Sequence, residues 1–346
     1  KRQIEIPEDW AHKEIEIFLE RVLWESRVYL DGIEISRQDA LGTPHIHKLG
    51  AVKPGKHELI VLVDNEMIHN IGDKGHAYGA YTQSIWNGIV GEMHMLARDI
   101  TSFLETKVYP DIHNDEILLK CRVKSEEENS VEIGYRILAV ANGQEVLSGA
   151  FASALNQGVT NFEHTISTEG KLEQWSEFNP EVYTLKLALI AGDSRDFQEI
   201  EFGFCDISHD GTKILVNGSP VFLRGNLDCV HFPLTGYVSC QLEDWLKIFS
   251  IYKEYGFNHA RFHSWCPPEA AFKAANRLGN YLQAEASIWI DWWMSTNMIE
   301  RGRPEMDTKG YPQGLGHDSL RDQFVIAEMN RIVDYYGNHP SFAMFC

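Results

Sequence analysis

Residues 221–286 contain three short apolar runs, VFLRGNL at Val221–Leu227, FNHARFH at Phe257–His263 and YLQAEA at Tyr281–Ala286. Two segments whose apolar residues recur at helical spacing lie between them, at Leu242–Tyr255 and Pro268–Leu278. Strands that alternate with helices at this spacing are typical of parallel βαβ units with right-handed connections. This stretch therefore predicts a parallel sheet.

The rest of the C-terminal region continues the pattern, with a third helix predicted at Ser319–Tyr336 and a fourth strand at Ser341–Cys346. A doubly wound nucleotide-binding sheet needs a glycine-rich turn after its first strand. The turn here, Arg224–His231, has one glycine and several ionisable groups, which favours a barrel. Four strands make half of an eight-stranded barrel. We therefore expect the first half of a (β/α)8 TIM barrel, with the second half outside this sequence.

The sequence before residue 205 has a different secondary-structure pattern. Short β-type runs follow one another, and turn signals such as Asp31-Gly32, Pro54-Gly55 and Asn142-Gly143 separate them. Short strands separated at regular intervals by turns are typical of β-sandwiches. Because about 200 residues are too many for one simple sandwich, two are predicted, with a boundary near Thr101–Pro110.

Composition and charge exclude several classes of partner. The net charge is −19, from 31 Lys and Arg against 50 Asp and Glu, so nucleic acid is not an expected partner. No run of about 18 apolar residues occurs, so no membrane span is predicted. The first residues already alternate like a strand, which fits a start inside a domain. A periplasmic or secreted location is favoured over a cytoplasmic one, and homo-oligomerisation is left open.

Candidate site residues follow from the barrel interpretation, because functional groups of such barrels lie at the carboxyl ends of the strands. Carboxylates and arginine hydrogen-bond sugar hydroxyls, and aromatic faces stack on sugar rings, so a carbohydrate is the predicted partner. The alternatives are a structural ion pair between Arg261 and Glu285 and core packing for Trp265. The predicted substrate-binding residues are Asp228, His231, Arg261, His263, Trp265, Glu285 and Trp289.

Two aromatic segments and one histidine pattern provide further candidates. The long connection from Ser287 to Gly316, with Trp289, Trp292 and Trp293, predicts a substrate platform or lid. The cluster of His76, Tyr78, Tyr81 and Trp86 is interpreted as core where the first sandwich meets the barrel. His259 and His263 alternate along one strand, but no third ligand is clear, so no metal and no cofactor are predicted.

Motifs along nearly the whole chain resemble glycoside hydrolase family 2, which includes β-galactosidases, β-glucuronidases and β-mannosidases. The resemblance lies in the order and spacing of the motifs. They are Ile6-Pro7-Glu8-Asp9-Trp10, Val28-Tyr29-Leu30-Asp31-Gly32, Lys53-Pro54-Gly55, Val63-Asp64-Asn65, Gly88-Ile89, Trp175-Ser176, Asn179-Pro180, Tyr183, Phe202-Gly203-Phe204 and Leu215-Val216-Asn217-Gly218-Ser219-Pro220 through Arg224-Gly225.

This resemblance implies three domains: a jelly-roll β-sandwich at 1–103, incomplete at its N-terminus, an immunoglobulin-like β-sandwich at 104–205, and a TIM barrel at 206–346 that is truncated after about four strands. It implies a retaining β-glycosidase that removes terminal β-linked sugars, most like a β-galactosidase, with two glutamates about 5 Å apart. The family's Asn-Glu acid/base follows a stretch like His339-Pro340-Ser341. It is therefore expected just after Cys346, with the nucleophile further on, so no catalytic residue is expected within the chain.

Some positions carry over from the family and some depart from it. Arg261 matches a site arginine, and Glu285 matches an acidic residue that binds a metal in some members. The histidine after Arg261 stands one position early, at His263, and Cys229 stands where some galactosidases have histidine. These departures leave the sugar open. A non-catalytic glycan-binding protein built on the same modules is the alternative function.

Overall fold

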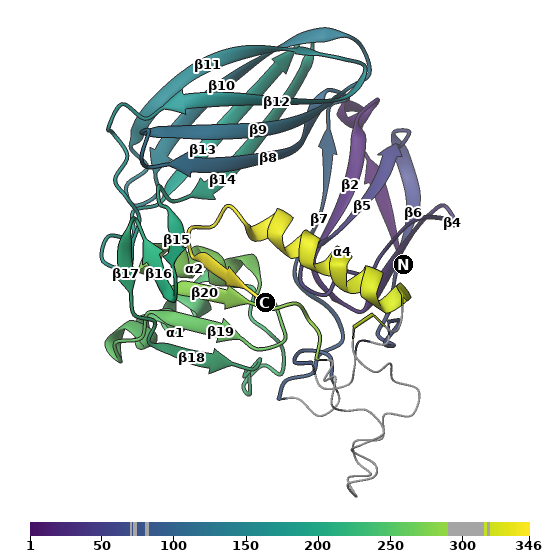
Figure 1. Ribbon diagram of the computed structural model, residues 1–346. Coiled ribbons are helices and arrows are strands. Elements are labelled where there is room, and N and C mark those ends of the chain that lie inside the picture. The colour runs from purple at the N-terminus through teal and green to yellow at the C-terminus, as the bar shows by residue number, and fades with distance from the viewer. Residues whose placement is uncertain (70, 72–74, 80–82, 290–314, 317–318) are drawn as a thin grey trace, which may run out of the picture.

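The computed structural model describes residues 1–346 except 70, 72–74, 80–82, 290–314 and 317–318 (Figure 1). Two β-sandwiches and a parallel sheet make up the molecule. In Figure 1 the first sandwich lies at the right, the second at the top and the parallel sheet at the lower left. Among the described residues, no helix is long and apolar enough to cross a membrane.

The first sandwich packs a four-stranded sheet against a three-stranded sheet. Alternating residues such as Ile15, Ile17 and Leu19 are buried between the sheets, as the period of a strand requires. A single turn of 3-10 helix, Glu8–Trp10, follows the first strand. The sheet orders are β1 (Arg2–Ile6), β6 (Gly55–Asp64), β3 (Glu25–Leu30), β4 (Ile33–Gln38), and β5 (His45–Ala51), β2 (Glu14–Leu23), β7 (Gly88–Arg98).

The second sandwich repeats this architecture with longer strands and its own core, in which Leu119, Ile133 and Leu187 are buried. Strand β8 (Ser102–Asp111) runs through Pro110, at the predicted boundary between the two sandwiches. Since β8 is an edge strand, a residue without an N–H is tolerated there. The sheet orders are β11 (Glu145–Leu155), β10 (Asn129–Ala139), β13 (Tyr183–Ala191), β14 (Ser194–Phe202), and β12 (Gly158–Ser167), β9 (Glu116–Ser125), β8 (Ser102–Asp111).

A small antiparallel sheet leads into the parallel sheet, and it corrects one prediction. The strand expected at Val221–Leu227 is in fact two. Val221 ends β17, which belongs to the small sheet, and the first parallel strand begins only at Gly225. The small sheet contains β15 (Ile207–Asp210), β16 (Lys213–Val216) and β17 (Ser219–Val221).

The parallel sheet has its four strands in sequential order, with the helices between them. The expected helices are present, and Trp245 and Phe249 of the first are fully buried. The second helix ends at Gly279, whose φ of 68° is the left-handed conformation that a glycine C-cap adopts. The elements are β18 (Gly225–Asp228), α1 (Leu242–Glu254), β19 (His259–Phe262), α2 (Glu269–Leu278), β20 (Tyr281–Ala284), α4 (Ser319–Tyr336) and β21 (Phe342–Phe345).

Helix α4 connects the three parts of the molecule, and Figure 1 shows it running from beside the second sandwich to the first. Its Asp334 pairs with Lys107 of β8. Its Glu328 is fully buried and accepts a hydrogen bond from the backbone N–H of Leu41, in the first sandwich, at 3.1 Å. These contacts tie α4 to both sandwiches.

Candidate carbohydrate-binding site

The candidate site lies where the parallel strands end. Strands β18 and β19 are in register, with Leu227 opposite Arg261 and Asp228 opposite Phe262. Their carboxyl ends therefore meet at one edge of the sheet, where β20 also ends, just before Glu285. The segment between β6 and β7 of the first sandwich reaches this edge, because the Ser84 hydroxyl accepts a hydrogen bond from the Phe232 N–H at 3.1 Å.

Arg261 and Glu285 form an ion pair at this edge, as the alternative reading of the sequence anticipated. The Arg261 Nε donates to Glu285 Oε1 at 2.6 Å, and the backbone N–H of Ser264 donates to Oε2 at 2.7 Å. Both carboxylate oxygens are thus held, and the Glu285 side chain is only 9% exposed. The Arg261 side chain is 43% exposed, so part of the guanidinium faces solvent and can still donate to a ligand.

Asp228 organises the backbone around the edge. Its Oδ1 accepts from the Val230 N–H at 2.8 Å, and its carbonyl oxygen accepts from the His263 N–H at 2.9 Å and from the Trp265 indole at 3.2 Å. Burial raises the pKa of the Asp228 carboxyl, against the smaller lowering effect of the Val230 hydrogen bond. The residue thus ties the turn after β18 to the turn after β19.

His263 stands at the centre of an aromatic group. Its Nδ1 lies 3.1 Å from Nε2 of His76, which comes from the first sandwich, and its ring meets that of Trp289 edge-on at 4.8 Å between centroids. Burial lowers the pKa of His76, and the nearby His263 lowers it further. Two imidazoles and an indole thus form one wall beside the charged pair.

The other predicted residues differ in how far they are exposed. His231 is exposed on the loop after β18. Trp265 is 3% exposed and packs on Phe262 and Trp245, so the structure places it in the core behind the site. Of the long aromatic connection, Trp289 is described, whereas Trp292 and Trp293 lie outside the described residues.

The aromatic cluster of the first sandwich divides into two parts. Tyr78 and Trp86 are buried in the same core as Phe262, which confirms their interpretation as packing residues. His76, assigned with them, instead reaches the site, and its backbone N–H donates to the Ser264 hydroxyl at 3.0 Å. Tyr81 lies outside the described residues. No sequence pattern separated His76 from its neighbours.

Cys229 is the second residue that the sequence reading did not place in the site. It is buried, 7% exposed, and lies beside Asp228 and near Arg261 and Glu285. Burial raises the pKa of its thiol. The signals in the sequence were its position at the expected end of the first strand, between Asp228 and His231, and its place where some galactosidases have histidine.

Comparison with known proteins gives sequence and structural relatives, although no protein-family model matches the chain. A β-galactosidase of Thermoanaerobacterium thermosulfurigenes is 26% identical over 244 residues, covering 68% of this chain and 34% of that enzyme. A glycosyl hydrolase family 2 member of Bacteroides cellulosilyticus has a TM-score of 0.75 at 17% identity, covering 99% of this chain and 44% of that one. A β-glucuronidase of Bacteroides uniformis has a TM-score of 0.75 at 18% identity, covering 98% and 39%.

The fold and the relatives define a class: the chain is similar to glycosidases, which are hydrolases. More narrowly, it resembles glycoside hydrolase family 2. The chain spans about a third of the length of the curated relative and less than half of either of these solved structures.

Proposed function

We propose that this chain forms part of a retaining β-glycosidase that removes terminal β-linked sugars from glycans, most like a β-galactosidase. In this proposal the first sandwich is the jelly-roll domain, the second is the immunoglobulin-like domain, and the parallel sheet is the first half of the TIM barrel. The observation that carries the proposal is the Arg261–Glu285 pair at the carboxyl edge of the sheet, where both carboxylate oxygens are held and the guanidinium is half-exposed.

The geometry of β21 supports a place for the catalytic acid/base. Cys346 and Ala286 lie side by side, because the Cys346 N–H donates to the Ala284 carbonyl at 3.1 Å and the Cys346 carbonyl accepts from the Ala286 N–H at 3.0 Å. A residue joined to Cys346 would therefore leave β21 beside Glu285. We propose that the two catalytic glutamates lie outside these 346 residues and that the acid/base enters the site here. In a retaining mechanism it would face the nucleophile at about 5 Å.

The role of Arg261 is to bind and orient the sugar. A half-exposed guanidinium offers N–H donors to ring hydroxyls while its Nε remains on Glu285. The wall of His263 and Trp289 offers an aromatic surface to the apolar face of a ring. Loss of a contact that binds the ground state and the transition state equally raises KM, whereas loss of a contact made only in the transition state lowers kcat.

The test compares the 346-residue chain with a longer natural chain that contains it. Each is assayed with nitrophenyl β-galactoside, β-glucuronide and β-mannoside. We expect turnover only from the longer chain, and strongest with the galactoside. In the longer chain Arg261→Ala should lower kcat/KM by at least about tenfold, which is 1.4 kcal/mol, without changing the far-ultraviolet circular dichroism.

Matched controls make this test decisive. Arg122→Ala removes an exposed arginine on β9 of the second sandwich and should leave turnover unchanged. Turnover by the 346-residue chain would contradict the placement of the glutamates. A longer chain that binds β-glycosides but hydrolyses none would instead favour the glycan-binding alternative.

A further inference from the structure

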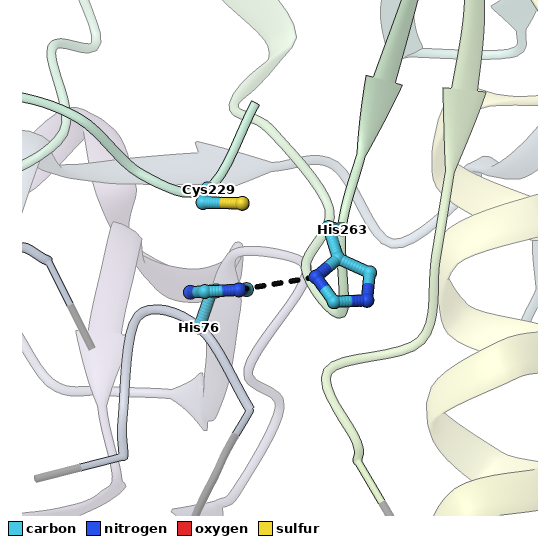
Figure 2. A group of neighbouring side chains, drawn as sticks. All are labelled: His76, Cys229 and His263. Atoms are coloured by element: carbon cyan, nitrogen blue, oxygen red, sulfur yellow. Dashed lines mark hydrogen bonds between the residues drawn. The ribbon is translucent and has the colours of Figure 1, made fainter. Parts of the chain in front are cut away.

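Three metal-ligating side chains converge beside the Arg261–Glu285 pair. His76 comes from the first sandwich, Cys229 follows β18 and His263 follows β19. Their ligand atoms all lie within 4.8 Å of one another, and no other such trio of His, Cys, Asp or Glu occurs in the part of the chain that the structure describes. Figure 2 shows the Cys229 sulfur and the facing nitrogens of the two imidazoles turned toward one space.

The distances suit a small tetrahedral ion. Nε2 of His76 and Nδ1 of His263 are 3.1 Å apart. Two imidazole nitrogens that share a tetrahedral zinc at about 2.0 Å each are roughly 3.3 Å apart, and a thiolate sulfur lies roughly 3.6 Å from either. An ion can therefore take the place of the hydrogen bond between the rings. The sulfur needs a movement of about 1.2 Å at most, which a small rotation of the cysteine side chain supplies.

The backbone holds all three ligands before any ion binds. The His76 N–H donates to the Ser264 hydroxyl at 3.0 Å, and the His263 N–H donates to the Asp228 carbonyl at 2.9 Å. Cys229 lies in a turn closed by the Val230 N–H on the Asp228 carboxylate. A site whose ligands are already positioned loses little conformational entropy when the ion arrives.

The surroundings and the donor atoms select the ion. Asp228 and Glu285 lie near the ligands, and Arg261 is the cation near them, already paired with Glu285. One thiolate and two imidazoles suit zinc, whereas magnesium and calcium prefer oxygen donors. Three protein ligands also leave a tetrahedral zinc one open position.

We propose that His76, Cys229 and His263 bind a zinc ion whose fourth position is open at the carboxyl edge of the sheet. That position takes water or, where a sugar occupies the edge, one of its hydroxyls. Zinc binding itself does not depend on the proposed glycosidase function, because the ligands are complete within this chain. The zinc ion joins the first sandwich, through His76, to the parallel sheet, through Cys229 and His263.

The experiment measures zinc in the 346-residue chain, purified with any histidine tag removed. The protein is stripped with a chelator, dialysed against zinc and analysed by mass spectrometry of the metal. We expect one zinc ion per chain. Because loss of residues that merely support a ligand costs about 10–100-fold in metal affinity, Cys229→Ser and His263→Ala should each weaken zinc binding by at least about 100-fold.

Matched controls are Cys346→Ser, which removes an exposed cysteine, and His113→Ala, which removes an exposed histidine; both should bind zinc like the unaltered chain. Circular dichroism establishes that each variant is folded. Cobalt added to the stripped chain should give a thiolate-to-metal charge-transfer band that Cys229→Ser abolishes. The charge-transfer band of the unaltered chain still tests the proposal if a variant does not fold.

Three results would overturn the proposal: less than a stoichiometric amount of zinc, zinc retained by folded Cys229→Ser, or binding of copper alone. None of them bears on glycoside hydrolysis by the longer chain. Conversely, a longer chain without hydrolytic activity leaves the zinc measurement unaffected. Failure of one proposal is therefore distinguishable from failure of the other.

Discussion

Substitution of Glu328 tests how α4 joins the first sandwich to the parallel sheet. The side chain is fully buried, and its Oε1 accepts the N–H groups of both Leu41 and Gly42, while Oε2 accepts from Arg331 at 2.8 Å. Glu328→Ala leaves two buried N–H groups without an acceptor, at about 1–3 kcal/mol each. Arg331 is partly exposed and regains water, so it adds little. We expect a total loss of about 2–6 kcal/mol.

Glu328→Gln should cost much less. Burial raises the pKa of Glu328, which means that the site disfavours the charged form even with Arg331 beside it. A neutral amide keeps an oxygen for both N–H groups, so we expect a loss of about 1 kcal/mol. The matched control is Asp334→Ala on the same helix, which removes a largely exposed partner of Lys107 and should cost about 0–1 kcal/mol.

The assay is urea unfolding followed by tryptophan fluorescence, which reports on the core that contains Trp24 and Trp86. With a slope of about 2 kcal/mol per molar urea, Glu328→Ala should lower the midpoint of the transition by about 1–3 M. A midpoint equal to that of Asp334→Ala would refute the anchoring role. Equal losses in the alanine and glutamine variants would show that the charge, not the acceptor oxygen, is what matters.

Two further perturbations test the fold. Burial lowers the pKa of His45 and of His47 to about 4, so the unfolded chain binds more protons than the folded chain below pH 6.5. The free energy of unfolding should therefore fall from about pH 6.5 toward pH 4. A His45→Gln/His47→Gln variant whose melting temperature has the same pH dependence as the unaltered chain would contradict this. Gly279→Ala places a Cβ 2.8 Å from the backbone of Glu177 at a φ of +68°, so it should destabilise the fold by several kcal/mol. Gly211→Ala is the control, because it has a φ of +57° but open space around it, and it should cost about 1 kcal/mol. Thermal unfolding measures both.

Local patterns predicted most elements of the parallel sheet. The helix expected at Leu242–Tyr255 is α1 at Leu242–Glu254, because a stripe of apolar residues at helical spacing leaves few other ways to bury it. The strand expected at Val221–Leu227 was wrong in its extent. Its first residue pairs with β16 rather than with the parallel sheet, and only the partner strand decides that.

In the candidate site too, local patterns predicted some features and the tertiary structure decided others. Arg261 and Glu285 were predicted correctly as neighbours, since adjacent parallel strands bring their carboxyl ends together. Trp265 was predicted in the site from its position at the end of the second strand, with core packing as the alternative. Ser264 has a φ of +54°, so the chain turns after the strand, and the Trp265 indole is buried in the core.

The sequence by itself determined the parallel sheet, the two sandwiches before it and the residues at the strand ends, because strand and helix periods and turn residues act over a few positions. The tertiary structure alone decided that His76 meets His263, 187 residues away, and that Cys229 lies beside both. That contact depends on how the first sandwich docks on the sheet, through α4 and the segment before β7. Docking depends on surfaces assembled from distant segments, and no local pattern encodes them.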